Sequence, residues 1–249
     1  SAGVPFNVTK AEQLRDELEA IKDPIAKEIV DTIPPWVVEE EFIPKRDNKT
    51  RGYKKGVPHI KKRKEAFNPG STLQISKFFR ETYNWHAVEL TDAGRPKMTG
   101  DILATLPYKE APLFAKYLQV RKLLSQLSTG KKAWLKVVKA GRIHGSVNTL
   151  GTRTRRCSHS APNLGQIPNP KGFKGNECRE LFEAGEGMKM VGCDAAALEL
   201  RLLAHYLSAY DDGEYSRKLL QSDIHSENQK SSGLETRDLA KTFIFSFIY

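Results

Sequence analysis

The last fourteen residues, 236–249, place cationic and aromatic side chains at a spacing that suits a nucleotide. The segment TRDLAKTFIFSFIY is a helical pattern that begins with a capping-type threonine. Arg237, Lys241 and Phe245 recur every four residues and share one helix face, about 6 Å apart along the axis. Tyr249 follows one turn later. This stripe predicts a nucleoside triphosphate site, with phosphates near the positive end of the helix dipole. A surface helix with two solvated cations and a buried ring fits the stretch equally well.

A second segment places a carboxylate directly after an apolar run. Residues 190–193 (MVGC) have the composition of a short buried strand that ends at Asp194, and Cys193 is expected to fill the core. A helical pattern follows at once. An aspartate at the carboxyl end of a buried strand is well placed to bind a hard divalent cation. Alternatively, Asp194 caps the helix, which leaves Glu199 and Arg201 only a solvated helix face to explain them.

Together, the two segments resemble motifs A and B of the family A DNA polymerases, the group that includes bacterial DNA polymerase I. Residues 194–205 match motif A, D-x-x-x-x-E-L-R followed by A-H, and residues 237–245 match motif B, R-x-x-x-K-x-x-x-F. Residues 141–148 (GRIHGSVN) and 155–168 (RRCSHSAPNLGQIP) are similar to the segment of the family that binds primer and template. The sequences of these motifs most resemble those of the polymerases of short-tailed, T-odd bacteriophages. Asp-Ile-His at 223–225 fits that group too.

The resemblance implies nucleotidyl transfer with two Mg²⁺ ions, which activate the primer 3′-hydroxyl and neutralise the leaving pyrophosphate. Asp194 would bridge the two ions, and the backbone carbonyl of Ala195 would be a second ligand. His225, Arg237 and Lys241 would hold the phosphates. Lys241 is the expected proton donor to the leaving group, because an ammonium can lose a proton where a guanidinium cannot.

The resemblance also assigns contacts to the sugar, the template and the duplex. Glu199 would lie under the sugar and exclude a 2′-hydroxyl, Phe245 would contact the nucleotide, and Tyr249 would stack at the templating position. Three polar residues would reach the minor groove near the primer end: Arg156, Asn163 and Gln166. Purine N3 and pyrimidine O2 accept hydrogen bonds there in every base pair, so correct shape is checked without reading sequence. Arg179 is expected to pair within its own domain.

The implied fold class is α+β, a partial right-hand polymerase with a helical thumb, an incomplete antiparallel palm sheet and the beginning of helical fingers. The expected ranges are a thumb at 1–140, the first half of the palm with motif A at 141–208, and the fingers up to the motif B helix at 209–249. Long thumb helices are predicted over 9–33, where Pro34 and Pro35 end the pattern, and over 111–128. Palm strands are predicted to begin at 143–147.

Residues 45–64 form a basic insertion in the predicted thumb, with ten Lys and Arg against Asp47 as its single acid. Gly52, Gly56 and Pro58 interrupt any regular pattern, which predicts a loop or a partly ordered insertion. The loop is interpreted equally well as a contact that follows the DNA backbone or as a mobile, solubilising segment. In the phage relatives a larger insertion at this place recruits a processivity partner. This insertion is much shorter, so the processivity factor stays unassigned.

Bulk properties agree with a DNA partner. The 249 residues carry a formal charge of +10 and a pI of about 9.4, which suits a polyanion, and 39% hydrophobic content suffices for a core. No apolar run approaches the length of a membrane span and no signal peptide begins the chain, so we expect a cytoplasmic protein without membrane contact, in a bacterial host if it is phage-encoded. The three cysteines lack metal-site spacing and are expected to be reduced.

Family A catalysis also needs a second metal-binding aspartate from a later His-Asp-Glu segment, which this sequence does not contain. His159 and His205 are not followed by Asp-Glu. We therefore expect one piece of a split polymerase, inactive until a complementing polypeptide supplies that aspartate, with primer-template DNA and dNTP as the other partners. The alternative is an engineered or processed inactive fragment that acts only as a DNA-binding module. Four retained residues argue against a module freed from catalysis: Asp194, Glu199, Arg237 and Lys241.

Overall fold

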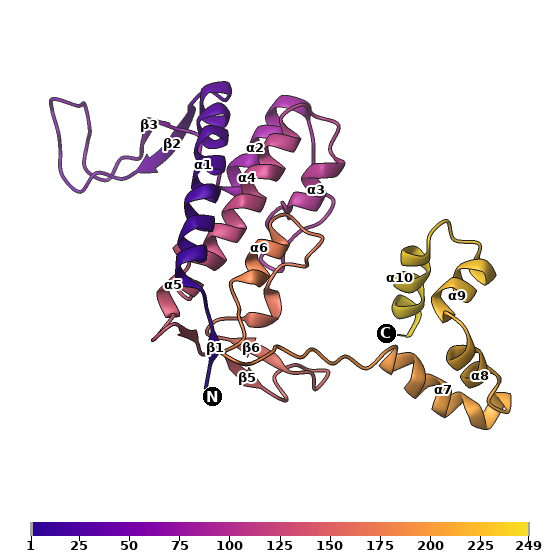
Figure 1. Cartoon of the computed structure of the whole chain (residues 1–249). Coiled ribbons are helices and arrows are strands. Elements are labelled where there is room, and N and C mark those ends of the chain that lie inside the picture. Colours follow the sequence, from indigo (N-terminus) through magenta and orange to yellow (C-terminus); the bar gives the residue numbers. More distant parts are fainter. Residues whose placement is uncertain (1, 249) are drawn as a thin grey trace. The chain divides into compact units, whose positions relative to one another are not determined.

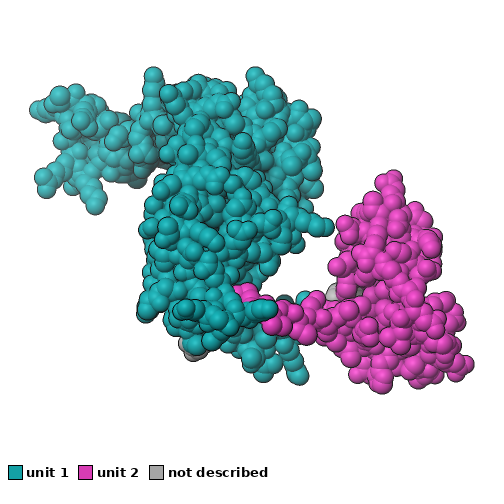
Figure 2. All heavy atoms as spheres, in the orientation of Figure 1, with its two compact units in different colours: residues 1–189 teal, residues 190–249 magenta. Residues whose placement is uncertain are grey.

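The computed structural model describes residues 2–248. The chain divides into two compact units, Ser1–Lys189 and Met190–Tyr249, which Figure 2 shows in different colours. The elements are labelled in Figure 1. Three two-stranded antiparallel sheets accompany the helices of the described residues, so the predicted α+β class is confirmed.

The longest helix of the first unit is α1, Val8–Thr32. The Asn7 side chain accepts a hydrogen bond from the Lys10 backbone N–H at 2.9 Å and caps the helix. The helix ends at Ile33, directly before the two prolines. Its apolar positions lie on one buried face: Ala11, Leu14, Leu18, Ile25 and Ile29. The predicted helix over 9–33 is confirmed within one residue at each end.

Four α-helices follow α1 in this unit, before a further one, α6 at Gly175–Glu180. They are α2 at Thr72–Tyr83, α3 at Gly100–Thr105, α4 at Ala111–Leu124 and α5 at Trp134–Val137. A π-helical turn, Ser125–Thr129, continues α4, so the predicted helix over 111–128 is confirmed with a wider last turn. Helices α1 and α4 pack side by side (Figure 1). One core cluster lies around Phe79 and Phe114, and a second around Leu18 and Leu127.

The predicted basic insertion, residues 45–64, lies within a β-hairpin. Strand β2, Trp36–Phe42, pairs with strand β3, His59–Glu65, in antiparallel register. The prediction of a loop or partly ordered insertion without regular structure over 45–64 is therefore wrong at its carboxyl end, where a strand begins at His59. The run of lysines obscured the strand, because its pairing partner lies about twenty residues earlier in the chain.

The short strands of the first unit form two separate pairs. Strand β1, Val4–Pro5, pairs with β4, Arg142–Ile143, and strand β5, Ser146–Asn148, pairs with β6, Ser158–Ser160. Strands do begin in the predicted range 143–147, but His144 and Gly145 separate them into different sheets. A 3₁₀ turn at Leu164–Gln166 and helix α6 at Gly175–Glu180 follow.

The second unit consists of four helices: α7 at Leu198–Asp211, α8 at Glu214–Gln221, α9 at Ile224–Ser232 and α10 at Arg237–Ile248. A small core of Leu200, Ala204, Leu219 and Ile224 holds them together. The boundary of the unit at 189/190 groups the motif A helix with the predicted fingers. The proposed boundaries at 140/141 and 208/209 stay predictions.

The predicted buried strand over 190–193 is wrong. The segment is extended but unpaired, Met190 and Val191 are 61% and 86% exposed, and Cys193 is exposed rather than a core residue. A strand is held by its neighbours, and no described residue pairs with this one. Among the described residues, no helix is long and apolar enough to span a bilayer.

Candidate functional site

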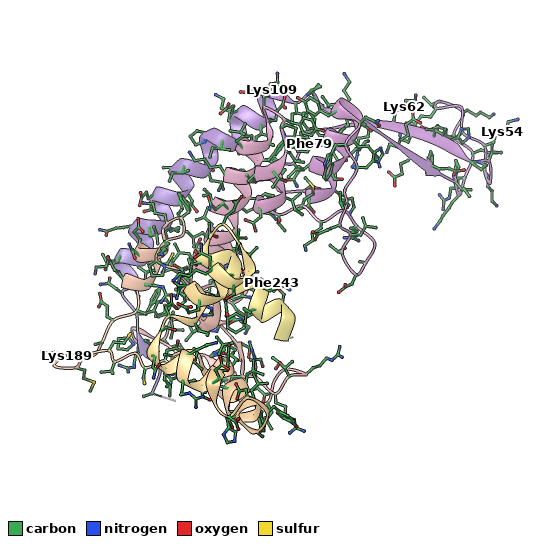
Figure 3. The ribbon with its side chains drawn as sticks, turned by 90° about the vertical axis from the view of Figure 1, so that its right-hand side faces the viewer. Lys54, Lys62, Phe79, Lys109, Lys189 and Phe243 are labelled. Carbon is green, nitrogen blue, oxygen red and sulfur yellow. The ribbon has the colours of Figure 1, made fainter. Side chains whose placement is uncertain are left out.

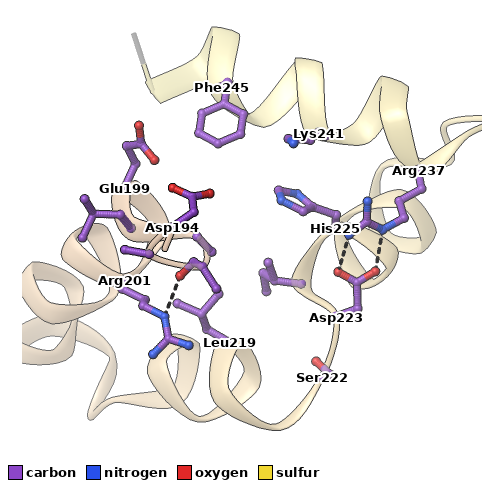
Figure 4. Close-up of a pocket in the computed structure, with 15 residues that line it drawn as sticks. Asp194, Glu199, Arg201, Leu219, Ser222, Asp223, His225, Arg237, Lys241 and Phe245 are labelled. Atoms are coloured by element: carbon purple, nitrogen blue, oxygen red, sulfur yellow. Dashed lines mark hydrogen bonds and ion pairs between the residues drawn. The ribbon is translucent and has the colours of Figure 1, made fainter. Parts of the chain in front are cut away.

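A cleft of about 590 Å³ lies within the second unit (Figure 4). Three parts of the chain form it: the segment that leads into α7, the connection between α8 and α9, and one face of α10. Its polar lining residues are Asp194, Glu199, Arg201, Ser222, Asp223, His225, Arg237 and Lys241. Carboxylates, cations and a ring from residues more than forty positions apart therefore face one hollow.

Helix α10 presents the predicted stripe to this cleft. The Thr236 hydroxyl accepts a hydrogen bond from the Leu239 backbone N–H at 3.2 Å, so the predicted threonine cap is confirmed. Arg237, Lys241 and Phe245 all line the cleft (Figure 4). On other positions of α10, Ala240 is fully buried and Ile244 packs against the core, which fixes the rotation of the helix. Tyr249 lies outside the described residues.

Arg237 is held by Asp223 through two hydrogen bonds. Its Nε donates to Asp223 Oδ2 at 2.6 Å and its Nη2 donates to Oδ1 at 2.9 Å. The Ser226 hydroxyl also donates to Oδ2, at 2.7 Å. The Arg237 guanidinium, followed by the Ser226 hydroxyl, holds the pKa of the Asp223 carboxyl well below its ordinary value. The planar guanidinium retains further N–H groups with which to bind an anion.

Sequence reasoning missed this ion pair. It took Asp223 only as part of a family pattern, although an aspartate directly before a helix is a signal for side-chain contacts at that helix end.

His225 is buried and faces the same cleft. Only 8% of the residue is exposed, and its Nδ1 has no hydrogen-bond partner among the described residues. Its ring lies 6.2 Å from the Phe245 ring, centroid to centroid. Burial, and then the nearby charges of Arg237 and Lys241, lower the pKa of His225 below its ordinary value, against the opposing effect of Asp223. The imidazole is therefore neutral at pH 7, with a nitrogen that lacks a partner.

Asp194 lies in the cleft opposite Lys241 and Phe245 (Figure 4). Helix α7 starts after Ala197, which has a left-handed backbone (φ 49°), so Asp194 is not the helix cap. The cap interpretation is therefore wrong. Arg201 closes the turn before the helix by donating from Nε to the Ala196 carbonyl oxygen at 2.8 Å.

The oxygen atoms at Asp194 are suitable ligands for a hard cation, but the set of metal ligands is incomplete. Carboxylate and carbonyl oxygens are the ligands that Mg²⁺ prefers, and both Asp194 and Ala195 line the cleft. Glu199 and Asp223 line it too. Within residues 2–248, however, no three Asp, Glu, His or Cys side chains gather closely enough to hold a metal ion. The described cleft thus offers oxygen ligands without an assembled group of three metal-binding side chains.

The predicted primer-template residues lie in the first unit, and all three are exposed. The Asn163 side chain accepts a hydrogen bond from the Gly165 N–H at 3.1 Å and caps the 3₁₀ turn, and the Gln166 carbonyl accepts one from Gln126 at 3.3 Å. The backbone N–H of Arg156 donates to the Thr152 hydroxyl at 2.8 Å. These contacts fix the backbone around Arg156, Asn163 and Gln166.

Arg179 donates from Nε to the Pro168 carbonyl oxygen at 2.9 Å. This bond lies within the first unit and agrees with the predicted internal pairing.

Comparison with known proteins identifies the family. The sequence profile of DNA polymerase family A matches residues 45–249. The DNA-directed DNA polymerases of Enterobacteria phage T3 and Escherichia phage T7 are each 40% identical to the chain over 215 residues, which is 80% of this chain and 30% of each relative. The thermostable DNA polymerase I of Thermus aquaticus is 33% identical over 74% of this chain and 23% of its own length.

Among solved structures, the chain is similar to the POL domain of Pol1 from M. smegmatis in complex with DNA primer-template and dNTP. The TM-score is 0.63 at 21% identity, covering 99% of this chain and 39% of that one, so the similarity shows a shared fold. The chain spans about 30% of the length of the phage relatives. With a profile match that extends over most of its residues, the chain belongs to DNA polymerase family A.

Proposed function

We propose that this chain carries the nucleotide-binding cleft of a template-directed DNA polymerase. The observation that carries the proposal is the cleft of Figure 4, where Arg237, Lys241 and Phe245 of one helix face Asp194 across a hollow. Cations at one end and a ring at the other suit a dNTP laid along the helix. The similarity to polymerases of bacteriophages supports DNA synthesis in the cytoplasm of a bacterial host.

Three residues bind the phosphates, each with a different role: Arg237, His225 and Lys241. Asp223 orients the Arg237 guanidinium, which holds phosphate in the ground state. His225, neutral and buried, offers a hydrogen bond from its ring. Lys241 has no carboxylate partner among the described residues, so its ammonium is available to protonate the leaving pyrophosphate.

Asp194 and the Ala195 carbonyl hold divalent metal in this proposal. Two Mg²⁺ ions, when bound, supply charge neutralisation and activation of the primer hydroxyl. Asp194 stands in the cleft with its side chain exposed, where it can accept such a ligand. Glu199, in the first turn of α7, excludes a 2′-hydroxyl from the sugar position, and Phe245 packs on the nucleotide. Tyr249 stacks at the templating position.

The proposed organisation follows the right-hand polymerases. Residues 1–140 form a thumb, 141–208 the first part of a palm and 209–249 the start of the fingers. Arg156, Asn163 and Gln166 contact the minor groove of the primer-template duplex. Their exposure and the anchored backbone around them support this role.

A second carboxylate must complete the metal site. A single aspartate cannot hold two Mg²⁺ ions together, because their mutual repulsion requires a second negative group between them. We propose that a polypeptide with the later palm segment supplies that group and that extension requires it. The second candidate function is a DNA-binding module without chemistry, which the net charge of +10 favours.

Primer extension tests both. The chain is assayed with labelled primer-template, all four dNTPs and Mg²⁺, alone and after mixing with a polypeptide that carries the later palm segment. We expect Mg²⁺-dependent extension in the mixture and its loss in Asp194→Asn. Extension by the chain alone would overturn the requirement for a second polypeptide. Tight duplex binding without extension in any mixture would support the binding module instead.

A further inference from the structure

The β2–β3 hairpin divides its charges between strands and tip. The strands carry four cations (Lys61, Lys62, Arg63 and Lys64) and four carboxylates (Glu39, Glu40, Glu41 and Glu65). Their register sets Glu39 opposite Lys62 and Glu40 opposite Lys61, and the first pair forms an ion pair at 2.7 Å. The paired strands are therefore neutral as a whole, although the sequence of β3 alone is strongly basic.

The tip, residues 43–58, keeps its charge. It has six cations against one carboxylate, which is half of the net charge of the chain. The cations are Lys45, Arg46, Lys49, Arg51, Lys54 and Lys55. The single acid, Asp47, accepts the backbone N–H of Lys55 at 2.7 Å instead of pairing with a side chain. Within the described residues, none of the six cations has a carboxylate partner.

The tip is folded rather than an irregular loop. Asn48 and Tyr53 exchange two backbone hydrogen bonds at 2.8 and 2.9 Å, and the Gly56 N–H donates to Pro44 at 3.0 Å. The Tyr53 ring packs on Phe42 and His59, with centroid distances of 5.0 and 4.9 Å. This aromatic cluster fixes the loop to the end of the strands, so the cations are displayed on an ordered support.

The base of the hairpin is anchored to the helices of the first unit. Trp36 packs on Phe67 at 5.6 Å between ring centroids, and Lys77 Nζ lies 4.7 Å from the Trp36 ring. From there the strands project away from α1 and α2, with Lys62 on the strand and Lys54 near the far end (Figure 3). The charged tip is thereby held out from the helices.

A hollow of about 430 Å³ lies at the tip. Lys45, Arg46, Arg51 and Lys61 line it together with Phe42 and Tyr53. The polar residues Glu40 and Asn48 complete the lining with Pro44. A recess with four cations around aromatic rings fits a phosphate group, and the cations outside it extend the same positive surface.

We propose that this hairpin tip binds the phosphodiester backbone of DNA, without reading its sequence. The inference rests on the proposed polymerase function, in which DNA is the polyanion that the chain binds. Unpaired cations on an ordered tip release counterions when they neutralise phosphates, whereas cations already paired to glutamates gain little. The tip cations, with Lys61 beside them, contribute duplex affinity, and the strand cations paired to glutamates do not.

The test compares two variants of equal charge. Arg51→Gln with Lys54→Gln removes two tip cations, and Lys62→Gln with Arg63→Gln removes two strand cations that are paired to glutamates. The dissociation constant of a fluorescently labelled primer-template duplex is measured by anisotropy between about 50 and 200 mM salt. The logarithm of the association constant falls linearly with the logarithm of the salt concentration. Each lost phosphate contact reduces the steepness of this line by about 0.9. We expect a decrease of about 2 for the tip variant and of less than 0.5 for the strand variant.

Equal slopes for both variants, or an unchanged slope for the tip variant, would overturn the proposal. A polyglutamate peptide is measured in parallel. If the tip variant loses peptide binding while its duplex slope stays at the wild-type value, the tip binds acidic peptides and the proposal is wrong. Far-UV circular dichroism checks that both variants fold. The result is independent of catalysis, because anisotropy measures duplex binding without primer extension, and we expect Asp194→Asn to keep the wild-type slope.

Discussion

The two cations of α10 differ in their partners, although sequence spacing makes them look equivalent. Asp223 accepts hydrogen bonds from two nitrogens of the Arg237 guanidinium, while Lys241 has no carboxylate partner among the described residues. A cation that is already oriented binds an anion with little rearrangement. A lone ammonium in a cleft has the greater freedom to exchange a proton. Their substitutions should therefore have different kinetic effects in the complete polymerase.

We predict that Lys241→Ala lowers kcat and that Arg237→Ala mainly raises KM for dNTP. Loss of a general acid costs on the order of 10²-fold or more in the chemical step, whereas loss of a ground-state contact leaves chemistry intact. Rapid-quench measurement of single-turnover incorporation separates the two constants. Lys241→Arg is the matched control, because it keeps the charge but cannot give up a proton. Unchanged kcat in Lys241→Ala under chemistry-limited conditions would show that another group is the acid.

Phe245 should make the polymerase discriminate against dideoxynucleotides. Its ring lines the cleft but offers no hydrogen bond to replace the one that an incoming 3′-hydroxyl makes. Phe245→Tyr adds a phenol that can do so, and one hydrogen bond in a closed site is worth about 1–3 kcal/mol. We expect the preference for dNTP over ddNTP to fall by roughly 5- to 150-fold, measured as the ratio of kcat/KM values. Phe245→Leu serves as the control that lacks a hydroxyl.

At the scale of elements, the end of α9 and the start of α10 are linked by groups that titrate. The folded pKa of Asp223 lies below its ordinary value of about 3.9, so its stabilisation is present above that pH and is lost as pH falls through the folded pKa. The folded pKa of His225 lies below its ordinary value of about 6.5, so burying it neutral costs nothing above that pH and costs stability below it. Both effects weaken the fold in acid.

We predict that helices α9 and α10 lose protection in two steps as pH is lowered, first below about 6.5 and then below about 4. Hydrogen exchange of peptides from 224–248, corrected for intrinsic rates, measures this. His225→Gln should remove the first step and Asp223→Asn the second, while peptides from α1 stay unchanged. A single step that persists in both variants would assign the acid sensitivity to other groups.

The elements that sequence predicted well are those whose pattern is local. Helix α10 carries its cap at Thr236 and its cleft-facing stripe within fourteen residues, and α1 carries a cap, an apolar face and a proline stop. What failed depended on distant partners. Residues 190–193 have strand composition but no paired neighbour among the described residues, and β3 is a strand because it pairs with β2, some twenty residues earlier. The Asp223–Arg237 pair likewise joins two helices.

At the scale of the whole molecule, the two compact units have separate cores of different size. The first unit has two large clusters rich in aromatic residues, and the second has one small cluster of four buried residues with three more packed against it. All three tryptophans, at 36, 85 and 134, belong to the first unit. So does Cys178, whose complete burial raises the pKa of its thiol to about 12, whereas Cys193 of the second unit is exposed.

We predict that the second unit unfolds before the first. A core of few side chains, each contributing about 1.5–3 kcal/mol, leaves the second unit with less stabilisation than the first. In a urea titration, far-UV circular dichroism sees the helices of both units, but tryptophan fluorescence sees only the first. The dichroism should therefore begin to change at lower urea than the fluorescence, and Cys178 should become reactive to a thiol reagent only with the later transition. Coincidence of all three probes would show instead that both units unfold as one cooperative body.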